Sequence, residues 1–357
     1  MTVAAATLAD CLIDWQRSHG RHDLPWQNTR DPYRVWLSEI MLQQTQVATV
    51  LAYYERFLQR FPDVASLAAA LQDDVLALWS GLGYYSRARN LHRCAQVLVA
   101  QHGGAFPRSS AALAELPGIG RSTAAAIAAF CFGERIAILD GNVKRVLTRV
   151  LGFGEDLAEL RHERALWQLA QQLLPERDIE AYTQGLMDLG ATLCTTRRPT
   201  CLVCPWTQPC EARIEGRPEA YPVKTRKLKR GQRSNSLLLL TRSDQIWLVQ
   251  RPQTGVWAGL WSLPDFADDA QLLALASQAT GSAATRSTPQ AWPALTHVLT
   301  HFDWWLQPWH WDLPARWPAA ARTRLEAALP SGRWQTRTEA LALGLPAPVR
   351  RLIDQLP

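Results

Sequence analysis

The sequence predicts an all-helical domain followed by a smaller mixed α/β domain. Its 357 residues, 47 % of them hydrophobic, are enough for two packed cores. Up to about residue 214 apolar residues recur every three or four places, as in Leu67, Leu71, Val75 and Leu78, which is the period of an amphipathic helix. Runs typical of β-strands begin only after residue 234. We therefore expect two architectures in series.

The first predicted domain covers residues 1–215. Its apolar period predicts helices over residues 8–17, 35–61, 64–79, 87–101, 110–116 and 122–132. Glycine and proline mark the ends of these segments at Gly81, Gly103, Pro107 and Gly133. Strand patterns are nearly absent, so we expect a helical domain.

Residues 216–233 interrupt this pattern. Gly216, Pro218 and Pro222 break any helix, and six of the ten residues from 224 to 233 are basic. We expect an interdomain linker, either a solvated charged segment or one that passes beside a phosphate backbone.

The second predicted domain covers residues 234–357. β-rich runs predict strands over 236–240, 246–250 and 295–306. The domain is rich in tryptophan, which suits a packed sheet core or, where exposed, stacking on bases or a partner.

Charge and composition indicate the compartment and the kind of partner. The net charge of +6 favours an anionic partner. No apolar run reaches the roughly 20 residues that cross a bilayer, and the N-terminus lacks the layout of a signal peptide. We expect a cytoplasmic protein with no membrane association and, without a coiled-coil repeat, a monomer. Cys11, Cys94 and Cys131 are expected to be buried thiols.

Four cysteines, Cys194, Cys201, Cys204 and Cys210, lie within seventeen residues, separated by six, two and five residues. Four thiolates brought together by one loop suit an iron–sulfur cluster or a structural zinc ion. Zinc usually takes two C-x-x-C pairs, and here only Cys201 and Cys204 form one, so the spacing favours a cluster without excluding zinc.

A second motif is the turn at residues 116–120, Leu-Pro-Gly-Ile-Gly, between two expected helices. Gly118 and Gly120 allow the backbone to approach a phosphate, as in a helix-hairpin-helix, although an ordinary interhelical turn has the same composition. Twenty residues after Gly120 comes Asp140, followed by Gly141. By itself this aspartate suits a helix N-cap.

Together these features resemble the endonuclease III superfamily of helix-hairpin-helix DNA glycosylases, over the whole helical domain. The segments WLSEIMLQQTQV (36–47) and GLGYYSRARN (81–90) are similar to the MutY family of adenine DNA glycosylases. The resemblance implies a helical glycosylase domain with one 4Fe-4S cluster in the loop 194–210. It also implies a double-stranded DNA substrate that contains adenine opposite 8-oxoguanine or guanine.

The resemblance assigns opposite roles to two carboxyls. Glu39 lies among apolar residues of its helix, so we expect its carboxyl to be partly buried with a raised pKa, the alternative being a surface glutamate on an amphipathic helix. The resemblance implies that it protonates adenine. Asp140 is expected to stabilise the positive sugar, with Asn142 as a helper. Ser122 stands where the lyase members carry lysine, which implies a monofunctional enzyme, and Lys144 is expected to contact phosphate.

Further positions follow from the same resemblance. Gln44 and Tyr84 match residues that open the duplex, and Gly118, Gly120, Ser122 and Lys144 match residues along the DNA backbone. The positions that match the adenine pocket are Leu24, Trp26, Leu42, Val47 and Gln184, and those that match the side of the opposing base are Thr45 and Leu82. Trp26, Leu42 and Val47 also suit an ordinary core.

The second domain resembles the Nudix-like domain of the same family, through Gln-Arg-Pro at 250–252 and GVWAGLW at 255–261. It lacks the acidic cluster that holds magnesium in Nudix hydrolases, so we expect lesion recognition there. Thr300 and His301, in the sequence Leu299-Thr300-His301, match the family's Phe-Ser-His loop, with the aromatic residue lost. Two alternatives stay open: another helix-hairpin-helix glycosylase, and a non-catalytic iron–sulfur protein that binds DNA.

Overall fold

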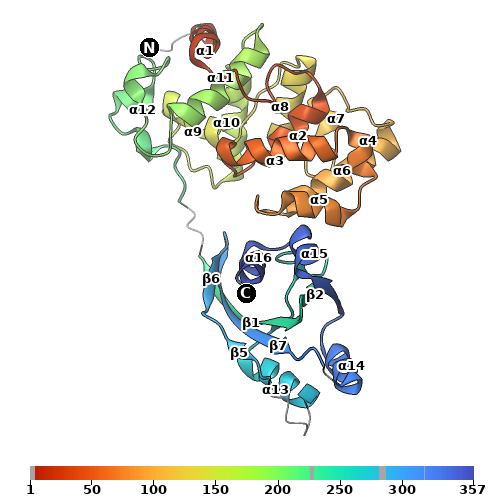
Figure 1. The fold of residues 1–357 in the computed structure, drawn as a ribbon. Coiled ribbons are helices and arrows are strands. Elements are labelled where there is room, and N and C mark those ends of the chain that lie inside the picture. Colours follow the sequence, from red (N-terminus) through yellow and green to blue (C-terminus); the bar gives the residue numbers. More distant parts are fainter. Residues whose placement is uncertain (1–4, 226–228, 281–286, 317) are drawn as a thin grey trace. The chain divides into compact units, whose positions relative to one another are not determined.

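A computed structural model describes residues 5–225, 229–280, 287–316 and 318–357 (Figure 1). The backbone divides into two compact units. Met1–Ala68 and Arg93–Lys227 form the first, and Ala69–His92 with Leu228–Pro357 form the second. Residues 226–228 of the expected linker lie outside the described part, and the expected domain boundaries stay a prediction.

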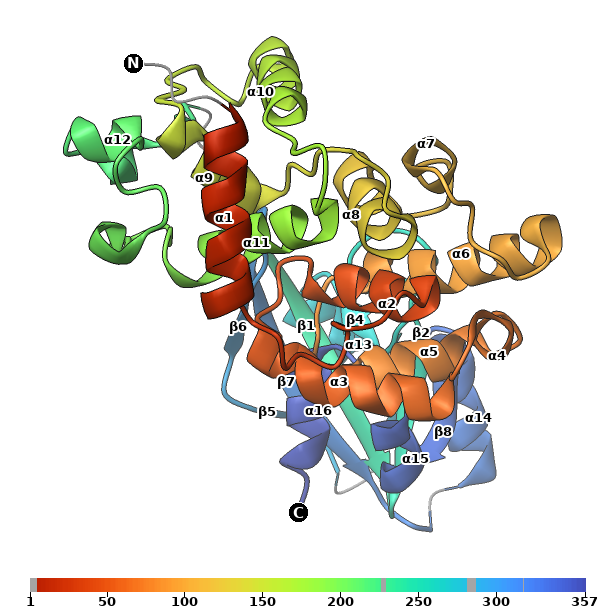
Figure 2. The ribbon, with the colours of Figure 1, turned by 90° about the horizontal axis from the view of Figure 1, so that it is seen from above.

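The first unit is helical, as expected. Its helices are α1 (Ala5–His19), α2 (Pro32–Leu42), α3 (Val47–Arg60), α4 (Val64–Ala68), the C-terminal part of α6 (Ser86–His102), α7 (Ser110–Leu113), α8 (Arg121–Phe132), α9 (Gly141–Val150), α10 (Leu160–Gln172), α11 (Ile179–Thr192) and α12 (Glu211–Ile214), with short 3-10 turns η1 (Cys201–Val203) and η2 (Pro218–Ala220). Figures 1 and 2 show α1 beside α11, with which it packs.

Alanine explains the position of α8. Ala124, Ala125, Ala126, Ala128 and Ala129 are all buried. Their small side chains let α2, α7 and α11 pack closely around this helix. Residues from α1, α8, α9, α10 and α11 share one apolar core, which also contains Trp206 from the loop that carries the cysteines.

Two expected helices are each broken in the structure. The expected helix 35–61 is α2 and α3, separated by a turn at residues 43–46 in which Gln44 has φ 57°. The expected helix 64–79 is α4 and α5 (Gln72–Trp79). Leu71, one of the residues of the expected apolar period, is the residue before α5 and is 71 % exposed. Neither break contains a glycine or proline, so the sequence carries no local signal for it.

The second unit is built on one mixed sheet. Its strands are β1 (Gly231–Arg242), β2 (Gln245–Gln250), β3 (Trp261–Ser262), β4 (Asp265–Phe266), β5 (Gln290–Ala291), β6 (Leu295–Val298), β7 (Phe302–Leu313) and β8 (Gly332–Thr336). The order β3-β2-β1-β7-β5 forms the main path, with β4 beside β1, β6 beside β7 and β8 beside β2. β1 and β7 run parallel, from Gly231 opposite Phe302 to Arg242 opposite Leu313.

Helices cover this sheet. They are α13 (Asp269–Thr280), α14 (Ala319–Ala328), α15 (Arg337–Ala342) and α16 (Ala347–Asp354). Leu237 to Leu240 of β1 are all buried, as expected for a central strand covered on both faces. α13 and α14 pack against Leu238 and Leu240, and Figure 1 shows α16 on the opposite side of the sheet.

Three further expectations have outcomes here. The expected strand 295–306 is the hairpin β6–β7, which turns at residues 299–301. Of the three cysteines expected to be buried, Cys94 is buried, Cys131 is partly buried, and Cys11 is exposed on α1, so the expectation was wrong for Cys11. None of the helices within the described ranges combines the length and the apolar character of a membrane span.

Candidate active site

Glu39 lies on α2 among buried neighbours. Trp36, Leu37, Ser38 and Ile40 are all 3 % exposed or less, so only the glutamate side of this turn retains some contact with solvent. Burial raises the pKa of Glu39 to about 8, and the negative charge of Asp140 adds to the effect. A carboxyl with this pKa carries its proton at neutral pH and can therefore act as an acid.

Asp140 is the N-cap of α9, the role that its context alone suggested. Its backbone is extended, and its Oδ1 accepts a hydrogen bond from the amide of Val143 at 2.7 Å. Burial raises the pKa of Asp140, while the amides of Val143 and Asn142 and the cations Arg145 and Lys144 oppose that rise. The cap role fixes this carboxylate at the positive end of a helix.

Ser122 connects the hairpin to this aspartate. Its hydroxyl oxygen accepts a hydrogen bond from the backbone amide of Leu139 at 3.0 Å. The turn before α8 supplies the expected geometry, since Gly118 has φ 78° and Gly120 is the N-cap of α8. Ser122 thus fixes the chain one residue before Asp140.

Asn142 and Lys144 are both engaged. Asn142 Oδ1 accepts a hydrogen bond from Arg145 Nη2 at 2.8 Å, and the same guanidinium donates to the carbonyl oxygens of Cys194 and Gly190. Lys144 Nζ forms an ion pair with Glu163. Contact of Lys144 with phosphate stays a prediction, and it requires this ion pair to open or to be shared.

The residues matched to the adenine pocket have mixed environments. Trp26 is 9 % exposed and packs edge-on against Tyr54 at 5.3 Å between ring centres. Leu24, Leu42 and Val47 are partly exposed, as is Thr45, whose amide bonds the carbonyl of Leu42 at 3.2 Å.

Gln184 is oriented by a residue that the sequence did not single out. Its Nε2 donates to Oδ1 of the fully buried Asp188 at 2.8 Å. Asp188 also accepts hydrogen bonds from Nε and the backbone amide of Arg21. Because a carboxylate only accepts, the amide oxygen of Gln184 must point away from Asp188.

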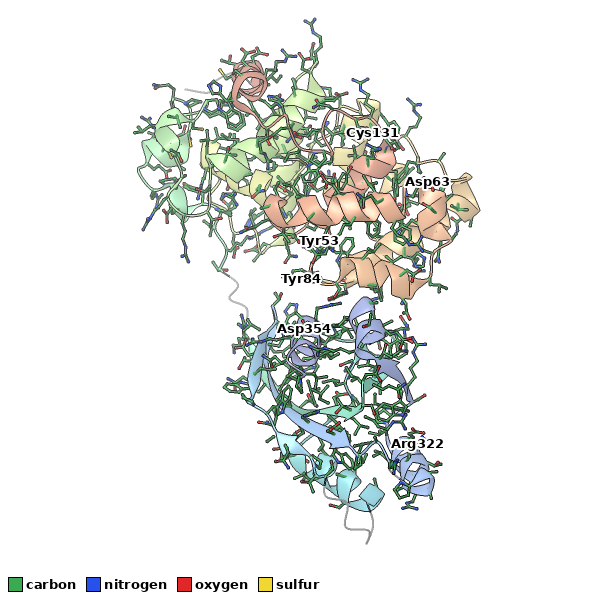
Figure 3. The ribbon with its side chains drawn as sticks, viewed as in Figure 1. Tyr53, Asp63, Tyr84, Cys131, Arg322 and Asp354 are labelled. Atoms are coloured by element: carbon green, nitrogen blue, oxygen red, sulfur yellow. The ribbon has the colours of Figure 1, made fainter. Side chains whose placement is uncertain are left out.

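Gln44 and Tyr84 share an unusual backbone. Gln44 has φ 57° and Tyr84 has φ 48°, and both side chains are exposed, Tyr84 by 47 %. Figure 3 labels Tyr84. Left-handed backbone at residues other than glycine is disfavoured and tends to occur at functional sites. Each is held exposed on a turn, Gln44 after α2 and Tyr84 before α6.

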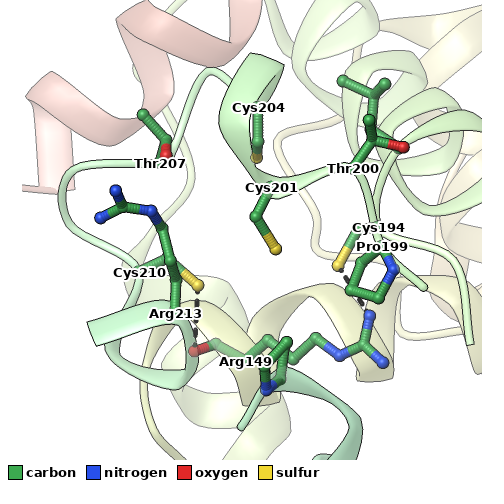
Figure 4. A pocket seen from close by; sticks show the side chains of 11 residues that line it. Arg149, Cys194, Pro199, Thr200, Cys201, Cys204, Thr207, Cys210 and Arg213 are labelled. Atoms are coloured by element: carbon green, nitrogen blue, oxygen red, sulfur yellow. Dashed lines mark hydrogen bonds between the residues drawn. The ribbon is translucent and has the colours of Figure 1, made fainter. Parts of the chain in front are cut away.

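The four cysteines line one pocket, shown in Figure 4. Burial raises the pKa of Cys204 to about 12 and also raises that of Cys210. Arg149 Nη1 lies 3.4 Å from Cys194 Sγ. Among the described residues no three histidine, cysteine or acidic side chains form a site for a single metal ion. The donor set of four thiols beside a buried cation nevertheless fits a negatively charged thiolate-bound centre.

In the second unit, Thr300 and His301 lie exposed in the β6–β7 turn. Thr300 Oγ1 is 3.3 Å from the hydroxyl of Tyr84. Leu82, which the resemblance placed near the opposing base, is buried.

Three aspartates at or just before the start of α13 each have a partner within the fold. Asp265 pairs with Arg251, Asp268 accepts from the amide of Gln271, and Asp269 accepts from Ser236 and Trp309.

Comparisons with known proteins agree with this arrangement. Residues 37–172 match the HhH-GPD superfamily of base excision DNA repair proteins, and residues 236–355 match the NUDIX domain. An adenine DNA glycosylase of Buchnera aphidicola from Acyrthosiphon pisum is 38 % identical over 73 % of this chain and 75 % of its own. One from Buchnera aphidicola subsp. Baizongia pistaciae is 32 % identical over 97 % of this chain and 95 % of its own.

A solved thermostable thymine-DNA glycosylase also shares the fold of the helical part. It is 28 % identical, with a TM-score of 0.53, and the alignment covers 59 % of this chain and 97 % of that one. The hairpin, the capped aspartate and these matches define the class, a DNA N-glycosylase with a helix-hairpin-helix domain followed by a Nudix-like domain. Within that class, the chain belongs to the adenine DNA glycosylase family.

Proposed function

We propose that this protein hydrolyses the N-glycosidic bond of adenine mispaired with 8-oxoguanine or guanine in double-stranded DNA, and leaves the strand intact. The observation that carries the proposal is the contrast between Glu39 and Asp140. One carboxyl is protonated at neutral pH, and the other is capped by a backbone amide at a helix N-terminus.

The chemistry follows from these two states. Glu39 gives its proton to N7 of adenine, which makes the base a better leaving group. As the bond between the base and C1′ breaks, the bonding electrons leave with adenine, and the negative Asp140 stabilises the positive sugar. Glu39, now a carboxylate, takes a proton from water, whose oxygen bonds to C1′. The products are adenine and an abasic site.

Ser122 supports the monofunctional part of the proposal. A strand-cleaving lyase needs an amine to form a Schiff base, and the Ser122 hydroxyl, which bonds Leu139, offers none. Lys144 is the nearest amine in sequence, and its ammonium group is engaged in an ion pair with Glu163.

Positioning is assigned to the remaining residues. Gln44 and Tyr84 act as wedges when the adenine is extruded, and Gln184 with Leu24, Trp26, Leu42 and Val47 forms the pocket. Asn142 assists Asp140. Gly118, Gly120, Ser122 and Lys144 follow the DNA backbone. Thr45, Thr300 and His301 contact the opposing base, and Leu82, which is buried, supports that side of the site from below the surface.

Cys194, Cys201, Cys204 and Cys210 would hold one 4Fe-4S cluster. The hydrolysis moves no electrons, so the cluster's contribution when bound is to order the loop 194–210. We further propose that residues 1–215 and 234–357 are joined by the linker 216–233, and that the protein acts as a monomer in the cytoplasm.

A single-turnover assay tests the proposal. The substrate is a duplex with one adenine opposite 8-oxoguanine, or opposite guanine or thymine, and abasic products are cleaved with alkali. We expect product only after alkali, formed fastest with 8-oxoguanine. Glu39→Gln should abolish product but keep duplex affinity, while Glu55→Gln, at an exposed glutamate on α3, should behave as wild type. Binding with intact adenine would instead support a non-catalytic protein, and product without alkali would support a lyase.

A further inference from the structure

Arg149 is a buried cation in the last turn of α9. It is 2 % exposed and is among the largest fully buried side chains. Within the described part of the chain, no carboxylate forms an ion pair with it. An uncompensated charge at such a depth is strongly destabilising. A buried arginine in this state indicates that its counter-charge comes from another kind of group.

The contacts of the guanidinium identify that group. Nη1 donates to the carbonyl oxygen of Thr195 at 2.6 Å, and Nη2 donates to that of Thr196 at 3.2 Å. Nε donates to the carbonyl of Tyr221 at 3.3 Å. The remaining contact is from Nη1 to Cys194 Sγ at 3.4 Å, the one acceptor of the four that can become an anion.

The backbone of Arg149 meets the same pocket from another side. Cys210 Sγ lies 3.5 Å from the carbonyl oxygen of Arg149. One residue therefore touches the first and the last of the four cysteines (Figure 4).

We propose that Arg149 is the residue that compensates the charge of the cysteine pocket and positions Cys194 within it. Its guanidinium hydrogen bonds fix the turn at residues 194–196, and its buried positive charge stabilises negative charge on Cys194 Sγ. The inference rests on the proposed cluster, and it assigns a function to a side chain that the hydrolysis does not use.

Two measurable consequences follow. We expect Arg149 to slow the release of a bound cluster because it orders the ligand turn. Residues around a metal site commonly change the metal affinity of that site by about 10- to 100-fold. If Cys194, Cys201, Cys204 and Cys210 held a cluster, its one-electron reduction at an electrode would add negative charge to the site. The guanidinium favours that more negative state, so the midpoint potential is higher with Arg149 than without it.

Three variants of the full chain test this. Arg149→Met removes both the charge and the guanidinium hydrogen bonds. Arg149→Lys keeps the charge but loses the planar set of N–H donors that makes those bonds. Arg213→Met removes a partly exposed arginine that lines the same pocket, where solvent screens its charge. Iron per chain, visible absorbance, the rate of iron release to a chelator and the midpoint potential by voltammetry are measured for each.

We expect Arg149→Met to release iron about 10- to 100-fold faster than wild type and to have a lower midpoint potential. Arg149→Lys should release iron faster but keep a potential near that of wild type, and Arg213→Met should resemble wild type in both. If Arg149→Met had the same rate of iron release and the same midpoint potential as wild type, the inference would be overturned. If that variant does not fold, wild-type release in Arg149→Lys would overturn it instead. Wild-type protein with no iron would refute the proposed cluster itself, a result that leaves adenine excision to be judged by its own assay.

Discussion

The hydroxyl of Ser122 accepts a hydrogen bond from the backbone amide of Leu139 at 3.0 Å, one residue before Asp140. This contact joins the hairpin helix α8 to the chain that carries the candidate catalytic aspartate. Ser122, which the resemblance places where lyases carry lysine, therefore has a structural role of its own.

Ser122→Ala should leave the Leu139 amide without its partner, next to a buried segment. We expect the free energy of unfolding to fall by about 1–3 kcal/mol, measured by urea denaturation, and single-turnover excision to slow. Ser122→Thr keeps a hydroxyl and should recover most of both. Equal loss in the two variants would show that the hydrogen bond is not the cause.

Activity should fall as pH rises through about 8. Glu39 acts in its protonated form, and its pKa is about 8, so the fraction of competent enzyme declines above that pH. Single-turnover rates between pH 6 and 9.5 measure this. A rate that keeps rising above pH 8 would rule out Glu39 as the acid.

Glu39 should also make stability depend on pH. Because its folded pKa lies above the unfolded value of 4.5, the folded state binds the proton more tightly, and the resulting stability is lost as pH rises from about 4.5 through 8. Glu39→Gln cannot ionise, so it should be more stable than wild type at pH 9, by about 2 kcal/mol or more. Denaturation midpoints of wild type and Glu39→Gln at pH 5 and pH 9 test this. If the difference in midpoint between the two proteins is the same at both pH values, the prediction is wrong.

Asp188→Asn should be strongly destabilising. It leaves the charge of Arg21 without its buried partner, at a cost of about 3–5 kcal/mol, and frees the amide of Gln184 to turn. Glu180→Ala breaks the exposed pair with Arg30 and should cost about 1 kcal/mol or less. Thermal unfolding of both variants measures the two losses of stability. Losses of similar size would mean that burial does not determine how much each ion pair stabilises the fold.

Gln44→Gly and Gln44→Ala separate backbone strain from wedge function. Both remove the side chain, but only glycine adopts φ 57° without strain, so Gln44→Gly should be more stable than Gln44→Ala by about 1 kcal/mol. Excision from duplex DNA should fall to the same extent in both. Excision at the wild-type rate in either variant would remove Gln44 from the wedge role.

Tyr84 and Thr300 should act together on the opposing base. Their hydroxyl oxygens are 3.3 Å apart, so Tyr84→Phe and Thr300→Val each remove one side of the same contact. In a double-mutant cycle on affinity for the adenine:8-oxoguanine duplex, we expect a coupling of about 0.5–1.5 kcal/mol. Additive losses would show that the contact has no role in the complex.

Periodicity predicted most of the fold, and its failures have identifiable causes. The helix ends marked by glycine were found close to their expected places, as at Gly133, the C-cap of α8. The turn at Gln44 was missed because a glutamine carries no local signal for a left-handed backbone. The hairpin at residues 299–301 was missed because Leu299 and Thr300 are themselves good strand residues.

The candidate site divides in the same way. The two acids, the hairpin glycines and the four cysteines were selected from the sequence, because their chemistry and spacing are local. Asp188 and Arg149 were not selected from the sequence, because nothing local distinguishes either of them from the other charged residues of its helix. Their importance depends on partners distant in the chain, Arg21 for one and Cys194 for the other.

Residue type, spacing and period were enough to predict the helical and α/β parts, the absence of the Nudix acids, and the groups available for chemistry. The pKa of Glu39, the cap that holds Asp140, and the burial of Arg149 against Cys194 could be seen only in the folded protein. Charge states and orientations depend on desolvation and on contacts between distant segments, whereas residue type and period are local properties of the chain.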